Sequence, residues 1–420
     1  MKTVSVGDEN GSAVQGATLQ SRLKHITDQL SQIQKAIESD ATSVGAFASD
    51  RDALVDAAKA VVAASKGPVD AVMDTMVMTA QMTAMRLFIS WKVFEAIPSQ
   101  GSISFEELGV QVKGDPALLA RIGGILVSNK ILMRDDSGNV SHTAMSAMLS
   151  SANPLTALVQ MGFDDYLSTL TSMPAYFKQY GLKEPDSQLD TIYAFACGDP
   201  TLTVFEHMAR NPERAANFML SMSAVGQGLT VAGSYDFGWA VETATKSEDR
   251  ILLVDIGAGR GDAVKSICKT NPGLPIERCV IEDVPQVVEE ASRTDDPVLS
   301  KAQYAGMDYH NEQPIKGALL YFIRRVLHDY GDTDAANILM HIRSAMASDS
   351  RLLIVEQVMS GCPSPLETAT DLFLGSIGGK ERTVQGFEKI VSAAGLGIER
   401  IEHGNPSDVA VIVCGLESAA

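Results

Sequence analysis

Three glycines follow directly on a run of apolar residues in the segment Leu252–Gly261, which reads LLVDIGAGRG. The run predicts a buried strand that enters a tight turn and continues into a helix over residues 262–268. Glycines in such a turn let a ligand approach the backbone, and ligands of such sheets bind beyond the carboxyl ends of the strands. Gly257 and Gly259 are therefore candidate ligand-binding residues.

The spacing of these glycines indicates the kind of ligand. Nicotinamide and flavin dinucleotides are bound by the pattern GxGxxG. Here the pattern is GxGxG, and Asp262 stands at the place of the last glycine. An acidic side chain beside that helix N-terminus would repel a pyrophosphate. S-adenosylmethionine (AdoMet) has no pyrophosphate, so the turn favours AdoMet, although a glycine turn without any ligand stays an alternative.

Two further loops carry side chains that suit the parts of a nucleoside. Asp283, in the segment EDVP, ends the next predicted strand, where a carboxylate can accept from both hydroxyls of a ribose. It can equally cap the helix that follows. In the next loop Asp308 can accept from an adenine amine and Tyr309 can cover the ring. Read singly these are ordinary loop residues, but their order along one sheet favours a nucleoside site.

A histidine and two glutamates could carry out acid–base chemistry. His328 lies in YFIRRVLHDY, at the end of a predicted strand beside the same crevice, although a lone loop histidine is more often structural. Glu356 ends the following strand and Glu381 lies in GGKERT. If His328 faces the pocket, these carboxylates could orient its imidazole and stabilise the protonated form. A pKa near its ordinary value of about 6.5 would suit a general base at neutral pH.

The elements that position these residues are predicted from Asp249 onward, where strands alternate with amphipathic helices such as 335–347. This alternation indicates βαβ units and a mostly parallel, doubly wound α/β sheet. The last two strands read as an edge pair joined by a turn at Asn405-Pro406. The predicted strands cover 251–256, 277–281, 317–322, 351–355, 398–403 and 408–415.

The part of the chain before residue 245 reads as mainly helical. Residues 103–148 have the order helix, helix, hairpin of a winged helix, yet the second helix carries only Arg121 and ends in Lys130, so a structural role is expected. The aromatic residues of 155–245 suit a core or a cavity for a flat substrate. The methionines of the helix before the winged helix read as core filler or a pocket wall; they are Met73, Met76, Met78, Met82 and Met85.

Composition narrows the class of protein. The 420 residues are enough for two domains, and 45% hydrophobic and 20% charged residues are typical of a globular protein. A net charge of −18 argues against a nucleic-acid partner. Absence of a signal sequence or a long apolar run predicts a cytoplasmic protein without a membrane segment. Five scattered cysteines and the histidine spacing predict no disulfide framework and no metal site.

Three regions are predicted along the chain. Residues 1–17 form a mobile tail, 18–245 a helical dimerisation and winged-helix domain, and 246–420 the AdoMet-binding domain. An apolar stripe over residues 19–37 has spacings close to a heptad seam, which predicts a helix that packs on its own domain or contributes to a dimer.

VDIGAGRG, EDVP, RRVLHDY with the downstream IVE, and GGKERT occur in this order. Together they resemble fungal-type secondary-metabolite O-methyltransferases, which are similar to plant caffeate and flavonoid enzymes, from about residue 75 to the end. The resemblance implies a homodimer through N-terminal helices, AdoMet as cofactor and a small aromatic or polyketide-type substrate. The departures are mild, since Ala258 replaces a usual glycine, Val284 a usual leucine and Tyr330 a usual tryptophan.

The resemblance also implies roles for individual residues. The implied cofactor contacts are Gly257, Asp283, Asp308, Tyr309 and Arg324. His328 would be the general base, with Glu356 and Glu381 beside it. Some members of the family instead catalyse dehydrations and pericyclic reactions with AdoMet as a fixed positive charge, and a cationic residue can replace the histidine there. Retention of all three residues favours methyl transfer to a hydroxyl. The intact glycine turn argues against a non-catalytic partner protein.

Overall fold

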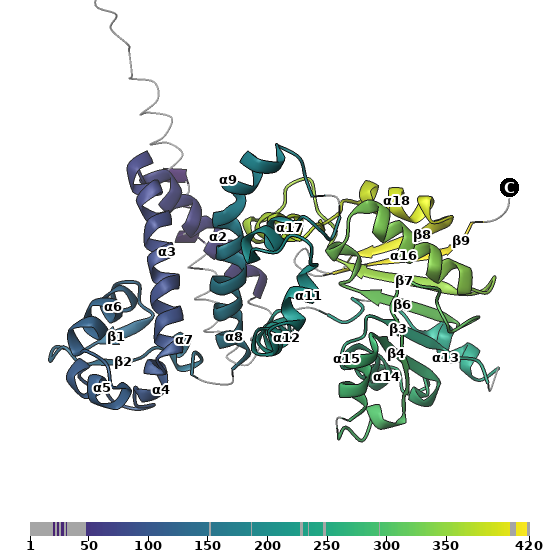
Figure 1. Cartoon of the computed structure of the whole chain (residues 1–420), viewed down its shortest axis with the longest axis horizontal. Helices are drawn as coiled ribbons and strands as arrows, with labels where there is room; N and C mark the ends of the chain where they lie inside the picture. Colours follow the sequence, from purple (N-terminus) through teal and green to yellow (C-terminus); the bar gives the residue numbers. More distant parts are fainter. Residues whose placement is uncertain are drawn as a thin grey trace, which may run out of the picture. The chain divides into compact units, whose positions relative to one another are not determined.

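The computed structural model describes residues 20–21, 23–24, 27–28, 31, 48–150, 153–185, 187–226, 230–233, 235–246, 249–293, 295–403 and 409–417. Contacts divide the chain into two compact units (Figure 1). The smaller unit comprises Met1–Phe88 and Gln100–Thr143, and the larger comprises Ile89–Ser99 and Ala144–Ala420. The predicted domains 18–245 and 246–420 stay predictions, and the predicted tail lies outside the described residues.

A mixed seven-stranded sheet forms the centre of the larger unit, in the order β5-β4-β3-β6-β7-β9-β8. The first five of these pair in parallel, and β9 is antiparallel to both β7 and β8. The predicted α/β class is confirmed. The strands are β3 (Leu253–Ile256), β4 (Cys279–Asp283), β5 (Gln303–Gly306), β6 (Leu320–Arg324), β7 (Arg351–Glu356), β8 (Leu396–His403) and β9 (Ala410–Leu416).

The prediction that the last two strands form an edge pair is wrong for β9. This strand lies between β7 and β8, and only β8 is at the edge. Its sequence AVIVCGL is apolar on both faces, and Val411, Ile412 and Val413 are fully buried. Such a continuous apolar run is typical of an interior strand covered on both faces.

Helices cover both faces of this sheet (Figure 1). One core lies under α16 (Asp332–Ala345) and α18 (Val384–Ala393), and the other lies under α13 (Gly238–Ala244) and α14 (Asp262–Thr270). Because β3, β4, β6 and β7 are parallel, their carboxyl ends meet at one edge of the sheet. Most residues singled out from the sequence follow these four ends, whereas Asp308 and Tyr309 follow β5 and Glu381 lies in the loop after α17.

The residues before the sheet in the larger unit are mainly helical, as predicted. A buried carboxylate, Asp165, joins three of these elements, because it accepts from the Tyr193 hydroxyl at 3.1 Å and pairs with Arg214. The elements are α4 (Val93–Ala96), α7 (Ala144–Ala147), α8 (Pro154–Met161), the π-helix η2 (Gly162–Leu167), α9 (Ser168–Tyr180), α10 (Ile192–Cys197), α11 (Val204–Ala209) and α12 (Pro212–Gly226). Tyr166 donates to the carbonyl of Ala369 at 3.0 Å and so ties η2 to α17 (Pro365–Ser376).

The smaller unit contains the predicted order of two helices and a hairpin. The helix α5 begins after Ser104, whose hydroxyl accepts from Glu107 N while the Glu107 carboxylate accepts from Ser104 N, a reciprocal capping box. An antiparallel pair of short strands follows α6. The elements of the unit are α2 (Ala48–Ser65), α3 (Pro68–Ser90), α5 (Phe105–Val112), α6 (Pro116–Ser128), β1 (Leu132–Arg134) and β2 (Val140–His142).

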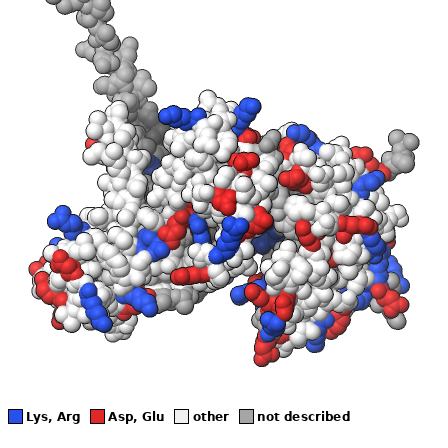
Figure 2. Space-filling model, viewed as in Figure 1, with Lys and Arg blue, Asp and Glu red and all other residues white. Residues whose placement is uncertain are grey.

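The prediction of a methionine-filled core is wrong for half of α3. Met73, Met76 and Met78 are 55%, 62% and 68% exposed, whereas Met85 is buried. Periodicity identifies an apolar face but does not tell what covers it. Much of the α3 surface carries no charged side chain (Figure 2). The predicted stripe over 19–37 lies outside the described residues except for an exposed Leu23.

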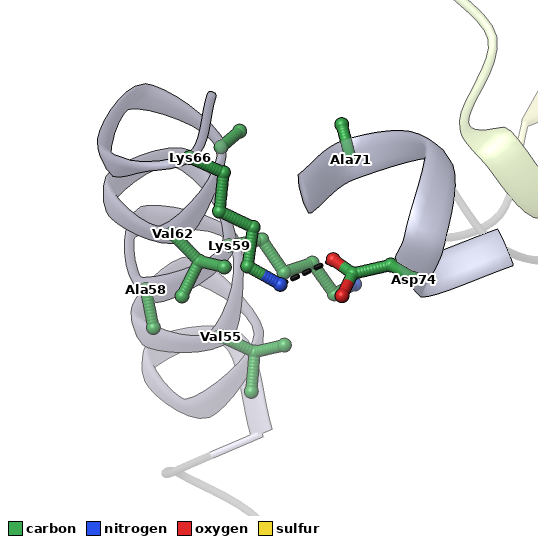
Figure 3. A pocket seen from close by; sticks show the side chains of 8 residues that line it. Val55, Ala58, Lys59, Val62, Lys66, Ala71 and Asp74 are labelled. Atoms are coloured by element: carbon green, nitrogen blue, oxygen red, sulfur yellow. Dashed lines mark hydrogen bonds and ion pairs between the residues drawn. The ribbon is translucent and has the colours of Figure 1, made fainter. Parts of the chain in front are cut away.

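A groove of about 560 Å³ runs between α2 and α3 (Figure 3). Lys66 and Asp74 form an ion pair across it. Its lining residues are Val55, Ala58, Lys59, Val62, Ala63, Lys66, Ala71 and Asp74. Within the described parts of the chain, no helix is both long enough and apolar enough to cross a bilayer.

Candidate active site

The glycine turn after β3 has two positions that packing reserves for glycine and one that faces open space. All three glycines have positive φ, at 71°, 55° and 84° for Gly257, Gly259 and Gly261. A Cβ on Gly257 would lie 2.7 Å from Val326 Cγ2, and one on Gly261 would lie 2.6 Å from Ile281 Cδ1. A Cβ on Gly259 would meet no described atom within 4 Å. Gly259 therefore leaves room for a ligand against the backbone.

Asp283 holds this turn from the neighbouring strand. Its Oδ2 accepts from Gly259 N at 2.8 Å, and its Oδ1 accepts from Val284 N at 2.8 Å. Burial raises the pKa of the Asp283 carboxyl. Each oxygen keeps a second lone pair, so the carboxylate can also accept from a ligand hydroxyl. The position of Asp283 is therefore compatible with both predicted roles, a cap of the local backbone and a contact to a ribose.

A second acid lies on the same face of the sheet and has no counterpart among the predicted site residues. Asp255 is 2% exposed, and its Oδ2 has no hydrogen-bond partner among the described residues. Burial raises the pKa of Asp255 to about 7, although the Arg324 cation opposes the rise. Asp255 pairs in register with Phe322, two residues before Arg324, so the two side chains share a face. The Arg324 guanidinium also donates to the carbonyl of Thr230 at 3.2 Å.

Tyr309 and Asp308 behave differently. Tyr309 Cε1 would lie 3.7 Å from a Cβ on Gly257, so its ring borders the glycine turn. Its hydroxyl shares a hydrogen bond of 2.8 Å with Tyr330, and burial raises the pKa of Tyr309, so this phenol stays neutral. Asp308 is exposed, and its Oδ1 accepts from His310 N at 2.9 Å within the same loop.

His328 lies in a short 3-10 turn after β6, η5 (Leu327–Asp329), and is buried. Its Nδ1 is 3.3 Å from Glu381 Oε1 and 3.6 Å from Glu356 Oε2. Its Nε2 is 3.7 Å from Asp329 Oδ1. The structure thus brings the predicted histidine and both predicted glutamates together and adds a third carboxylate, which the sequence did not single out.

Glu356 also supports the turn itself. Its Oε1 accepts from Val326 N and from Leu327 N, each at 2.9 Å. This leaves Oε2 directed at His328, and burial raises the pKa of Glu356 despite the nearby imidazole. The carboxylate therefore fixes the backbone before His328 with one oxygen and faces the ring with the other.

The charge state of the imidazole follows from these neighbours. Burial by itself lowers the pKa of His328, but the negative charges of Glu356, Asp329 and Glu381 outweigh burial and raise the pKa to about 9. This direction agrees with the expectation that Glu356 and Glu381 stabilise the protonated form, and the pKa lies above the value near 6.5 that would suit a general base at neutral pH. At pH 7 the imidazole is therefore mainly protonated in the protein without ligands.

Two residues that sequence reasoning missed contact the same turn. Arg382, the residue after Glu381, donates to main-chain carbonyls of the turn, and so does Gln188 from the loop before α10. The GGKERT segment already pointed to the position of Arg382. Gln188 precedes its acceptor Asp329 by 141 residues in an irregular segment, and no local pattern marks it.

Residues 180–397 match the O-methyltransferase domain family. "Methyltransferase cfoD" of Aspergillus candidus is 35% identical over 372 residues, which cover 87% of this chain and 92% of cfoD. A solved structure described as "A Pericyclic Reaction enzyme" is 25% identical, with a TM-score of 0.77 over 93% of this chain and 100% of its own. The crystal structure of OxaC has the same fold, with 22% identity and a TM-score of 0.85 over 96% of this chain and 100% of OxaC.

Proposed function

The chain belongs to the O-methyltransferase family, and from this premise we propose that it transfers a methyl group from AdoMet to a hydroxyl of a small aromatic or polyketide-type molecule. One observation carries the proposal. His328 is buried among carboxylates at the same sheet edge as the glycine turn, and Val326 links the two through its contact at Gly257. The group proposed as the proton acceptor is therefore close to the turn proposed to hold the cofactor.

The residues at the glycine turn fit AdoMet. Gly259 offers open space against the backbone, and Asp283 beside it can accept from the ribose hydroxyls. Tyr309 would cover the adenine from its place next to Gly257. The buried, unpartnered Oδ2 of Asp255 in the described structure can accept from the ammonium group of the methionine part. Gly257, Arg324 and Asp308 complete the proposed set.

His328 would take the proton of the substrate hydroxyl. Nδ1 faces Glu381 and Glu356, so a neutral imidazole donates its proton there and keeps Nε2 as the acceptor. AdoMet, when bound, supplies a methyl group on a positively charged sulfur. Once Nε2 holds the substrate proton, the three carboxylates stabilise the resulting imidazolium, and the deprotonated oxygen is the nucleophile that a methyl donor requires.

The pKa of His328 predicts the pH dependence of the reaction. Because the base must be neutral, kcat/KM for the acceptor should rise about tenfold per pH unit and level off near pH 9, when it is measured at AdoMet far below its KM so that the free enzyme predominates. The kcat profile should level off at lower pH, since a bound sulfonium cation opposes protonation of His328. Initial rates between pH 6 and about 10 measure both profiles, with an acceptor whose own hydroxyl titrates above this range. A flat kcat/KM between pH 7 and 9 would contradict the role of His328.

A second function has a specific observation in its favour. The protonated His328 is a buried cation at neutral pH, and a protein described as a pericyclic reaction enzyme shares 25% identity over 93% of this chain. A fixed imidazolium and a bound sulfonium could together polarise a substrate for dehydration or cyclisation without transfer of the methyl group.

One experiment separates the two functions. Purified protein is incubated with AdoMet and a panel of phenols and enols, and both S-adenosylhomocysteine and the organic product are followed by mass spectrometry. Methyl transfer yields S-adenosylhomocysteine and a product heavier by one methyl group in equal amounts. An isomerised or dehydrated product without S-adenosylhomocysteine would assign the pericyclic function instead.

We also propose that α3 pairs two copies of the chain. Its residues Val72, Met73 and Met76 are 59%, 55% and 62% exposed, and a cluster of exposed large apolar side chains is typical of a protein–protein interface. Val72→Glu combined with Met76→Glu is expected to halve the mass in light scattering. The control is Val110→Glu on α5, a lone apolar residue that is 80% exposed. A wild-type protein that is already monomeric would contradict the pairing.

A further inference from the structure

Arg382 donates hydrogen bonds to both ends of the turn that carries His328. The side chain is 1% exposed, and it donates to the carbonyl of Leu327 through Nη1 at 2.8 Å and to that of Tyr330 through Nη2 at 2.7 Å. These carbonyls flank His328 on either side. Asp332 at the start of α16 accepts from the same guanidinium at 3.1 and 3.2 Å. The guanidinium is thus fixed by one carboxylate while it holds two points of the turn.

The two carbonyls between these points are held by neighbouring groups. Lys380 N donates to the carbonyl of His328 at 2.8 Å, and Gln188 Nε2 donates to that of Asp329 at 2.7 Å. The approach of the two segments is close, because a Cβ on Gly379 would lie 2.2 Å from the His328 carbonyl oxygen. Only glycine fits there. All four carbonyls of residues 327–330 therefore have a donor from outside the turn.

Arg382 also connects the segments that carry the two glutamates. Glu381 precedes it directly, so the side chain that fixes the turn and the carboxylate that faces the imidazole share one stretch of backbone. The carbonyl of Arg382 accepts from Met359 N at 2.9 Å, and Arg382 forms an isolated parallel bridge with Val358, two residues after Glu356. One residue thus contacts the segments that position His328, Glu356 and Glu381.

We propose that Arg382 is a positioning residue that sets the distance between the His328 imidazole and its two glutamates, an inference that rests on the proposed role of His328. Arginine suits this task because its planar fork donates in several fixed directions at once. A lysine ammonium at the same place is a single point on a flexible stem, and it cannot hold two carbonyls and a carboxylate with the same geometry.

The expected effect has a sign that separates positioning from charge. If Arg382→Gln loosens the turn, Nδ1 moves away from Glu356 and Glu381, and the pKa of His328 falls towards its ordinary value. If the turn stays in place and only a positive charge is lost, the imidazolium becomes easier to form and the pKa of His328 rises. The titration is read by NMR on protein with labelled histidine, and His328→Ala identifies the signal. This readout needs no turnover.

Arg250 provides a matched control. It donates to the carbonyls of Gly317 at 2.8 Å and Ala318 at 3.4 Å and pairs with Asp349, so it also contacts two carbonyls and one carboxylate, at the opposite end of the sheet. Arg250→Gln is expected to lower the melting temperature while the His328 titration and kcat stay unchanged.

Arg382→Gln is expected to lower the pKa of His328 and to reduce kcat by about 10- to 100-fold, with AdoMet affinity within about threefold of wild type. A pKa that rises or stays constant, with kcat unchanged, overturns the proposal. If this variant does not fold, Arg382→Lys keeps a positive charge against Asp332 and is expected to show the same fall in pKa. Failure of the wild-type protein to form S-adenosylhomocysteine would refute the proposed function and leave the titration result standing.

Discussion

Replacing His328 by alanine is expected to reduce the formation of S-adenosylhomocysteine by about 10²- to 10⁴-fold, the usual contribution of a general base. The substitution removes the imidazole that faces both Glu356 and Glu381, and with it the group proposed to receive the substrate proton. AdoMet affinity should change less than about threefold, because the glycine turn and Asp283 do not contact the imidazole. Initial rates at saturating AdoMet, together with calorimetric titration of AdoMet, measure the two quantities.

The matched control for this experiment is His341→Ala. His341 lies on α16, outside the turn 327–330. Its replacement by alanine also removes an imidazole from the larger unit. Near-normal rates are expected. Turnover of His328→Ala within about tenfold of wild type would contradict the role of general base, and it would leave the carboxylates or the acidity of the substrate itself as the means of losing the proton.

Replacing Asp283 by alanine is expected to raise the dissociation constant of AdoMet by about 10- to 100-fold. Hydrogen bonds to a charged group are worth roughly 1.5–3 kcal/mol each, and each 1.4 kcal/mol changes an affinity tenfold. The variant loses an acceptor for the ribose hydroxyls, and it also releases Gly259 N, which the carboxylate holds at 2.8 Å. Calorimetry with AdoMet and with S-adenosylhomocysteine tests whether both ligands lose affinity equally, as expected for a contact to the shared nucleoside.

Two further variants help to separate loss of the ribose contact from disturbance of the glycine turn as causes of weaker AdoMet binding. Gly259→Ala keeps Asp283 but places a methyl group in the open space of the turn, so it should also weaken AdoMet binding, at a conformational cost of about 1–2 kcal/mol. Asp135→Ala removes a carboxylate that accepts from a backbone N–H in the smaller unit and should leave AdoMet binding unchanged. Wild-type affinity in Asp283→Ala would show that the carboxylate serves only the local turn.

The fold of the larger unit could be predicted because buried parallel strands read as unbroken apolar runs. Residues 252–254 and 318–323 are such runs, and the glycines and charged residues that follow them mark the carboxyl ends. The edge strand β5 has no such run, since QYAG is short and partly exposed, and no strand was assigned to it. The place of β9 inside the sheet is a matter of long-range pairing that a local pattern does not contain.

The residues of the site could be predicted from the sequence more readily than the protonation state of its histidine. His328, Glu356 and Glu381 could be found because each stands at the end of a recognisable segment. The pKa of His328 could not, because it depends on how far burial is outweighed by three carboxylates that meet only in the folded chain. Gln188 carries no sequence signal at all, since its meaning lies in one contact with Asp329.

The way in which the turn 327–330 is held has a consequence for how this scaffold can evolve. Arg382 and Gln188 donate to backbone carbonyls of this turn, and Glu356 accepts from two backbone N–H groups before His328. None of these contacts requires a particular side chain at position 328. A mutation at position 328 can therefore exchange the reactive side chain and leave the backbone conformation of the turn unchanged. Descendants of one ancestral scaffold could in this way acquire different reactions through a single codon, without first having to solve a new folding problem.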